Sequence, residues 1–155
     1  MKDVIFFTNE ALARFIAAQG RTVQKVVCHL WQNNFNPSNV FEIIDNVELH
    51  FKDGQKITIG CNDAGNGLDA MEYDPKIVAK HLREEFDGKM KLFSIDASET
   101  SMWKDVIGKE LRLVRLTKDG DFYVANTLML DFGDEKREIM INPEDGIIID
   151  FYEEI

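Results

Sequence analysis

The stretch that decides the fold class reads VELHFKDGQKITI and spans residues 47–59. Apolar residues occupy alternate positions on both sides of its Asp-Gly pair: Val47, Leu49, Phe51, Ile57 and Ile59. Period-two alternation is typical of a half-buried strand. Asp-Gly is typical of a hairpin turn, because both residues tolerate the positive φ angles that such turns require. The stretch therefore predicts a β-hairpin with one buried face.

A second stretch, LMLDFGDEKREIMI at residues 128–141, follows the same pattern. Its alternating apolar residues are Leu128, Leu130, Phe132, Ile139 and Ile141. We expect these residues to share a buried face as well.

The rest of the chain alternates short helical and β patterns. A helix is predicted over 9–19, with Asn9 as its cap and an apolar stripe of Leu12, Phe15 and Ile16. Two more helices are expected over 75–86 and 98–106. Strands are predicted at 22–31, 41–51, 56–60, 68–73, 90–95, 110–117, 123–132, 137–142 and 147–152. The predicted fold class is α+β: a largely antiparallel sheet or partly closed barrel with three short helices.

The two halves of the chain have similar patterns. A Gly-basic pair follows the first and third predicted helices, as Gly20-Arg21 and Gly108-Lys109. The aligned pairs include Phe15 with Trp103, Val23 with Leu111, Val26 with Val114, Ile57 with Ile139, and Gly67 with Gly146. Any two β-meanders share alternation and glycine turns. We nevertheless predict one domain over 1–155 with tandem β-meander-like units at 9–73 and 98–154, linked by a helix and strand at 74–97.

Composition limits the classes of partner. The chain has 155 residues, 45% of them hydrophobic, a formal net charge of −10 and a pI of about 4.7. Such a surface repels phosphate backbones and anionic lipid, so we expect neither nucleic acid nor membrane as a partner. Residues 98–155 carry seven basic and 14 acidic residues. Because the start has no signal-peptide pattern and Cys28 and Cys61 do not suggest a disulfide framework, we expect a cytoplasmic protein.

No motif of metal, cofactor or catalytic chemistry is found. The three histidines are spread over different predicted elements, although His29, His50 and Cys61 would meet if their strands were neighbours. The loop 62–69 lacks the oxygen ligands of a calcium loop. Nucleophile-elbow and phosphate-loop patterns are absent. Carboxylates such as Glu48 have the pattern of solvated positions. We therefore predict no metal, no cofactor and no enzymatic activity.

The candidate site lies in the second half. Phe122 and Tyr123 occupy a polar turn region and are surrounded in the sequence by Asp119, Asp121, Glu144 and Asp145. Aromatic anchors within an acidic field suit a basic protein partner. We predict a non-catalytic, acidic protein-binding module, an inhibitor or neutraliser of such a partner. In size, acidity and lack of motifs it is similar to the small immunity-type proteins that protect bacteria from their own toxins. The alternatives are a small-ligand-binding domain with a pocket between the two units, or an enzyme with no recognisable motif.

Overall fold

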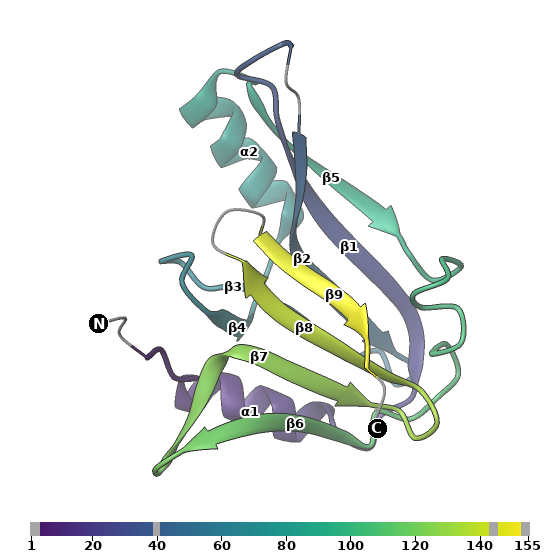
Figure 1. Cartoon of the computed structure of the whole chain (residues 1–155). Coiled ribbons are helices and arrows are strands. Elements are labelled where there is room, and N and C mark those ends of the chain that lie inside the picture. Colours follow the sequence, from purple (N-terminus) through teal and green to yellow (C-terminus); the bar gives the residue numbers. More distant parts are fainter. Residues whose placement is uncertain (1–3, 39–40, 143–145, 153–155) are drawn as a thin grey trace.

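The computed structural model describes residues 4–38, 41–142 and 146–152. This part of the chain is mostly β sheet, curled into a half-barrel with two helices (Figure 1). In chain order the elements are α1 (Asn9–Ala18), β1 (Val23–Asn33), β2 (Phe41–Phe51), β3 (Lys56–Cys61), β4 (Leu68–Met71), α2 (Pro75–Phe86), β5 (Met90–Asp96), β6 (Leu113–Asp119), β7 (Phe122–Asp131), β8 (Lys136–Asn142) and β9 (Gly146–Phe151).

The first half forms an antiparallel meander of β1, β2, β3 and β4, and β5 pairs with the outer edge of β1. Across the first hairpin, Val47 lies opposite Ile59 and Leu49 opposite Ile57. These four side chains and Phe51 are buried. The predicted inner face of this hairpin is confirmed.

The second half forms another antiparallel meander, of β6, β7, β8 and β9. Leu128, Leu130, Phe132 and Ile139 are buried, and Ile141 is half-buried against the core. Leu128 pairs with Ile139, whereas Leu130 pairs with Arg137.

The predicted alignment of Ile57 with Ile139 is therefore wrong by two residues: Ile59 corresponds to Ile139 and Ile57 to Arg137. With Val47 aligned on Leu128, the prediction makes the second turn one residue longer than the first. Phe51 N–H donates to Gln55 O, whereas Phe132 N–H donates to Glu135 O, so the second turn is instead one residue shorter, and the two differences add up to two residues.

Among the contacts that join the halves are two backbone pairings. β2 and β9 meet in a parallel bridge between Ile44 and Gly146, where a Cβ on Gly146 would lie 2.3 Å from the Ile44 carbonyl oxygen. The second contact is an antiparallel pairing of the short segments 20–23 and 108–111, centred on the bridge between Thr22 and Glu110. The core lies between the two meanders, and α1 closes one end of it (Figure 1).

Helix α1 is confirmed, but its cap and its buried face differ from the prediction. Thr8, not Asn9, is the N-cap, and its side chain accepts a hydrogen bond from Ala11 N–H at 3.1 Å. The buried side chains are Ala11, Phe15 and Ala18, while Ile16 is 69% exposed. The prediction assigned the larger apolar residues to the buried face, but the face that packs on the sheet contains small alanines.

The third predicted helix, over 98–106, does not form. The segment is a series of turns in which Trp103 N–H donates to Thr100 O and Val106 N–H to Trp103 O. Thr100 Oγ1 donates to Ala97 O at 2.6 Å, and Ser98 Oγ accepts from Val26 N–H at 2.9 Å. Ser and Thr side chains that bond nearby backbone compete with helical hydrogen bonds. Trp103 and Val106 are nevertheless buried in the core, as expected.

Helix α2 was predicted correctly and begins at the N-cap Asp74. It packs against β5 and buries Leu82. Neither helix of the described residues has the length and apolar character needed to cross a bilayer.

Candidate functional site

The predicted partner-binding residues are partly brought together at the β6–β7 hairpin. Phe122 is 61% exposed, and its ring packs on Phe6 with centroids 5.4 Å apart. Asp119 pairs with Phe122 across the hairpin, and both Asp119 and Asp121 are exposed. Tyr123 is half-buried, and its carbonyl accepts from Phe7 N–H at 2.9 Å. The hairpin projects from the half-barrel at the lower left of Figure 1.

Glu144 and Asp145, the other two predicted partner-binding residues, lie outside the described residues. Of the predicted partner-binding residues, Phe122, Asp119 and Asp121 are therefore the ones that lie exposed together at this hairpin.

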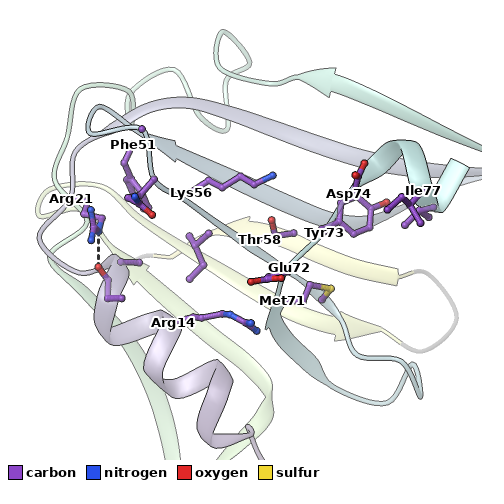
Figure 2. Close-up of a pocket in the computed structure, with 16 residues that line it drawn as sticks. Arg14, Arg21, Phe51, Lys56, Thr58, Met71, Glu72, Tyr73, Asp74 and Ile77 are labelled. Carbon is purple, nitrogen blue, oxygen red and sulfur yellow. Dashed lines mark hydrogen bonds between the residues drawn. The ribbon is translucent and has the colours of Figure 1, made fainter.

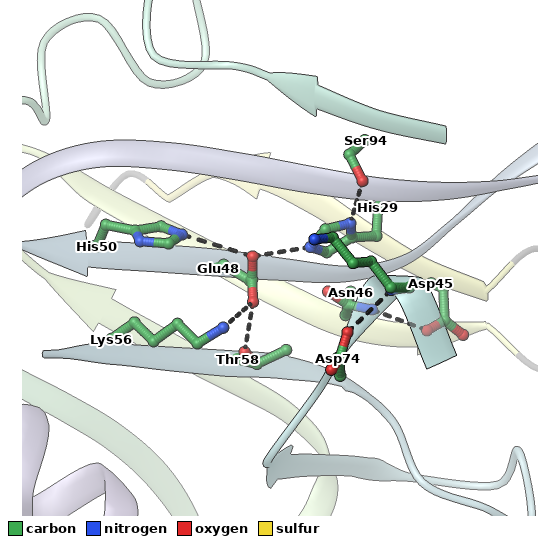
Figure 3. A network of polar contacts seen from close by, with 10 residues as sticks. His29, Asp45, Asn46, Glu48, His50, Lys56, Thr58, Asp74 and Ser94 are labelled. Atoms are coloured by element: carbon green, nitrogen blue, oxygen red, sulfur yellow. Dashed lines mark hydrogen bonds and ion pairs between the residues drawn. The ribbon is translucent and has the colours of Figure 1, made fainter. Parts of the chain in front are cut away.

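A polar cluster that sequence reasoning missed lies on the outer face of the first meander (Figure 3). Its centre is Glu48, whose side chain is 5% exposed. Glu48 Oε1 accepts from His29 Nε2 at 2.8 Å, and its Oε2 accepts from Lys56 Nζ at 3.0 Å and from Thr58 Oγ1 at 3.1 Å. His50 Nε2 lies 3.5 Å from Oε1. The prediction of Glu48 as a solvated residue is wrong, because this face of the sheet is covered.

The cluster keeps Glu48 ionised. Burial by itself raises the pKa of Glu48, but the hydrogen bonds from His29 and Lys56 outweigh it and lower the pKa to about 2. Because an ionised carboxylate only accepts hydrogen bonds, Nε2 of His29 carries a proton. The other ring nitrogen, Nδ1, lies 2.8 Å from Ser94 Oγ. His29 thus connects a buried carboxylate to a hydroxyl on β5.

Polar atoms beside this cluster are buried but unpaired. The Tyr73 ring lies 4.9 Å from the His29 ring, and burial raises the pKa of Tyr73 to about 12. The Tyr73 hydroxyl lies near Asn46 and Trp31. Yet Tyr73 Oη, Trp31 Nε1 and Asn46 Oδ1 have no hydrogen bond of good geometry within the described residues. Buried atoms of this kind commonly bind ordered water.

A cleft of about 820 Å³ opens beside the cluster, between α1, β3 and the start of α2 (Figure 2). The cleft shares residues with the polar cluster: its wall includes Lys56 and Thr58, which bind Glu48, and Tyr73, which packs beside His29. Arg14 of α1 and Arg21, which follows Gly20 beyond the end of α1, complete the basic part of the wall. The residues that line the cleft come from the first half and α2.

The geometry offers no metal centre in the described ranges, where no three His, Cys, Asp or Glu side chains gather for an ion. His29 and His50 do converge, but on the carboxylate of Glu48. Cys28 and Cys61 are free, and burial raises the pKa of each thiol to about 11. Thiols of such high pKa are poor nucleophiles.

The chain matches no protein-family model, no curated protein and no solved structure.

Proposed function

We propose that this chain is a non-catalytic, acidic module that binds a basic protein, as an inhibitor or immunity-type neutraliser does. The observation that carries the proposal is the exposed Phe122 ring on a projecting hairpin, beside the exposed carboxylates of Asp119 and Asp121. Aromatic side chains are enriched among the anchor residues of protein interfaces.

The two kinds of side chain have separate roles in this proposal. Phe122, supported by Phe6, supplies apolar area that becomes desolvated in the complex and so controls its lifetime. The carboxylates of Asp119 and Asp121 add to the net charge of −10 and attract a basic partner over distance. Such steering raises the association rate and is screened by salt.

We further propose that the two meanders are tandem copies of one unit. Segments 20–23 and 108–111 are aligned residue by residue, and they pair with each other as two copies related by a two-fold axis would. Val23 N–H donates to Lys109 O at 2.9 Å, and at the corresponding positions Leu111 N–H donates to Arg21 O at 2.8 Å. Gly108 N–H donates to Val23 O and Gly20 N–H to Leu111 O, which again are corresponding bonds. Pairing of a surface with its own equivalent is typical of two-fold assemblies.

Two further pairs of contacts support the repeat. An ion pair joins Arg21 to Asp53, and its counterpart joins Lys109 to Asp134. Both link the Gly-basic pair to a hairpin turn of its own half. In addition, Gly146 lies against Ile44 of β2, and its counterpart Gly67 lies against Ala125 of β7. A shared origin explains all of these at once.

The partner-binding proposal is tested by isolating a partner from the native lysate and measuring binding kinetics. We expect Phe122→Ala to speed dissociation about tenfold or more while the association rate is unchanged. The matched control is Phe35→Ala, because Phe35 is 51% exposed in a loop of the first half.

Charge reversal, Asp121→Lys, should slow association at low salt, and high salt should remove the difference. Asp63→Lys, at an exposed turn of the first half, is its control. If both hairpin variants fold and bind like the unmodified protein, the β6–β7 hairpin is not the interface.

A small-ligand-binding function is the second candidate, and the cleft beside α1 favours it. Its walls belong to the first half and α2, so this cleft is not the pocket between units expected from the sequence.

A further inference from the structure

The cleft beside α1 has the composition of a ligand site. At about 820 Å³ it lies within the range of small-molecule pockets. Its wall is mainly apolar, with a few charged side chains that converge on it; the apolar part is Ala17, Ala18, Phe51, Ile57, Met71, Ile77 and Val78. Ile77, at the start of α2, is 56% exposed and adds apolar surface to the cleft.

Basic side chains gather here although the protein as a whole is acidic. Arg14, Arg21 and Lys56 all line the cleft. Arg21 is held by Asp53, in the ion pair that recurs in the second half, so we assign it to the framework. Arg14 has no basic counterpart, because the residue aligned with it is Met102. Lys56 aligns with Lys136, but the carboxylate that holds Lys56 is replaced by Met129 in the second half.

Both of these cations retain hydrogen-bonding capacity. Arg14 Nη1 donates to Ala70 O at 2.7 Å, and Lys56 Nζ donates to Glu48 at 3.0 Å. A guanidinium has five N–H donors and an ammonium three. The Glu48 carboxylate is shared with His29 and Thr58, so Lys56 is not its only partner. Figure 2 shows Arg14 and Lys56 reaching into the cleft from α1 and β3.

The wall also holds two acidic residues, Asp74 and Glu72. Asp74 is the N-cap of α2, and its carboxylate already accepts from Lys76 N–H at 3.0 Å. Glu72 is exposed and follows Met71, the residue paired with Thr58, and Figure 2 draws its carboxylate on the side of Arg14. Three cations thus stand against two carboxylates in the wall, and the apolar surface from β3 to α2 lies beside them.

We propose that this cleft binds a small amphipathic anion, with its acidic group between Arg14 and Lys56 and its apolar body against Ile57, Met71 and Ile77. This site is separate from the β6–β7 hairpin, so it goes beyond binding of a basic protein and stands or falls independently of it. A charged group bound by Arg and Lys in a partly dry cleft forms charge-assisted hydrogen bonds.

The test uses the full-length, ¹⁵N-labelled protein and three probes. Octanoate carries both the charge and the apolar body, inorganic phosphate carries charge alone, and octylammonium carries the body with the opposite charge. We expect octanoate to shift the amides of residues 56–58 and 71–78 with saturation. Phosphate should shift the same amides only weakly, and octylammonium should not shift them.

Variants then identify the groups that bind. Arg14→Gln should weaken octanoate binding about tenfold, the loss of one charge-assisted contact. Lys104→Gln, an exposed lysine on the turns after β5, is the matched control and should bind normally. Lys56→Gln should also weaken binding, and its melting curve separates lost affinity from lost stability.

The proposal is overturned if octylammonium binds as tightly as octanoate, if Arg14→Gln binds octanoate normally, or if the shifts lie outside the cleft. It is also overturned if none of the three probes binds. Partner binding at the hairpin would be untouched by any of these results.

Discussion

Glu48 of the first meander and Met129 of the second occupy aligned positions, one residue after Val47 and Leu128 respectively. Both side chains are buried on the outer face of their sheet. Glu48 holds a polar cluster, whereas Met129 does not. The inner faces, by contrast, are apolar in both halves except at Arg137. The second meander therefore forms without a cluster of this kind around Met129. Features present in both halves belong to the framework, and features present once are candidates for function.

The largest effect is expected where the two halves agree. Phe51→Ala and Phe132→Ala remove rings that are both 2% exposed at aligned positions. Each should lower the free energy of unfolding by about 3–5 kcal/mol, because the cavity adds to the lost burial. Denaturant unfolding measures this. A variant of either residue that unfolds like the unmodified protein would break the comparison.

The next effect is expected where the halves differ. Glu48→Met places the residue of the second half into the first, but leaves His29 and Thr58 facing a side chain that accepts poorly. We expect destabilisation of about 3 kcal/mol, as for breaking a buried pair on one side. The alignment of Val26 with Val114 places His29 on Thr117. The double variant His29→Thr/Glu48→Met, which copies both residues of the second half, should recover part of the lost stability. Equal destabilisation by the single and double variants would show that the cluster is not a unit.

The difference between Glu48 and Met129 should also appear in the pH dependence of stability. Because the pKa of Glu48 is about 2 when folded and about 4.5 when unfolded, its stabilisation is present above pH 4.5 and is lost as the pH falls towards 2. The full effect is about 3 kcal/mol. Glu48→Gln should flatten the pH dependence of unfolding between these values. Met129→Gln, at the aligned position, should leave that slope unchanged.

The hairpins could be predicted from the sequence because each is local: alternation and a turn residue lie within a dozen positions. The polar cluster could not, since His29, Glu48, Thr58 and Ser94 come from four different strands. The pairing of β1 with β2 and β5, and of β2 with β3, brings them together. The prediction that Glu48 is solvated is wrong because strand alternation shows two faces and not which of them is covered.

The third helix failed for a local reason, the run Ser98 to Ser101, whose hydroxyl groups favour turns. The partner-binding residues illustrate the same limit. Sequence reasoning grouped Phe122 with Tyr123, but neighbouring strand residues point to opposite faces. Only Phe122 is left largely exposed.

The smallest effect is expected at the repeated surface ion pairs. Asp53→Asn and Asp134→Asn each remove an exposed partner, of Arg21 and Lys109 respectively. Exposed pairs contribute little and are screened by salt. Both variants should melt close to the unmodified protein, with any difference vanishing in high salt. A large loss from one and none from the other would mean that the two pairs are not equivalent.

The central claim, that two like units meet about a two-fold axis, is tested most directly by NMR at the Thr22–Glu110 bridge. In this antiparallel pairing the two residues form a non-hydrogen-bonded pair, whose Cα atoms lie about 4.5 Å apart. We predict a strong nuclear Overhauser effect between the Hα protons of Thr22 and Glu110, with slow hydrogen exchange at the amides of both Val23 and Leu111. Absence of the Hα contact, or protection of only one of the two amides, would contradict the account.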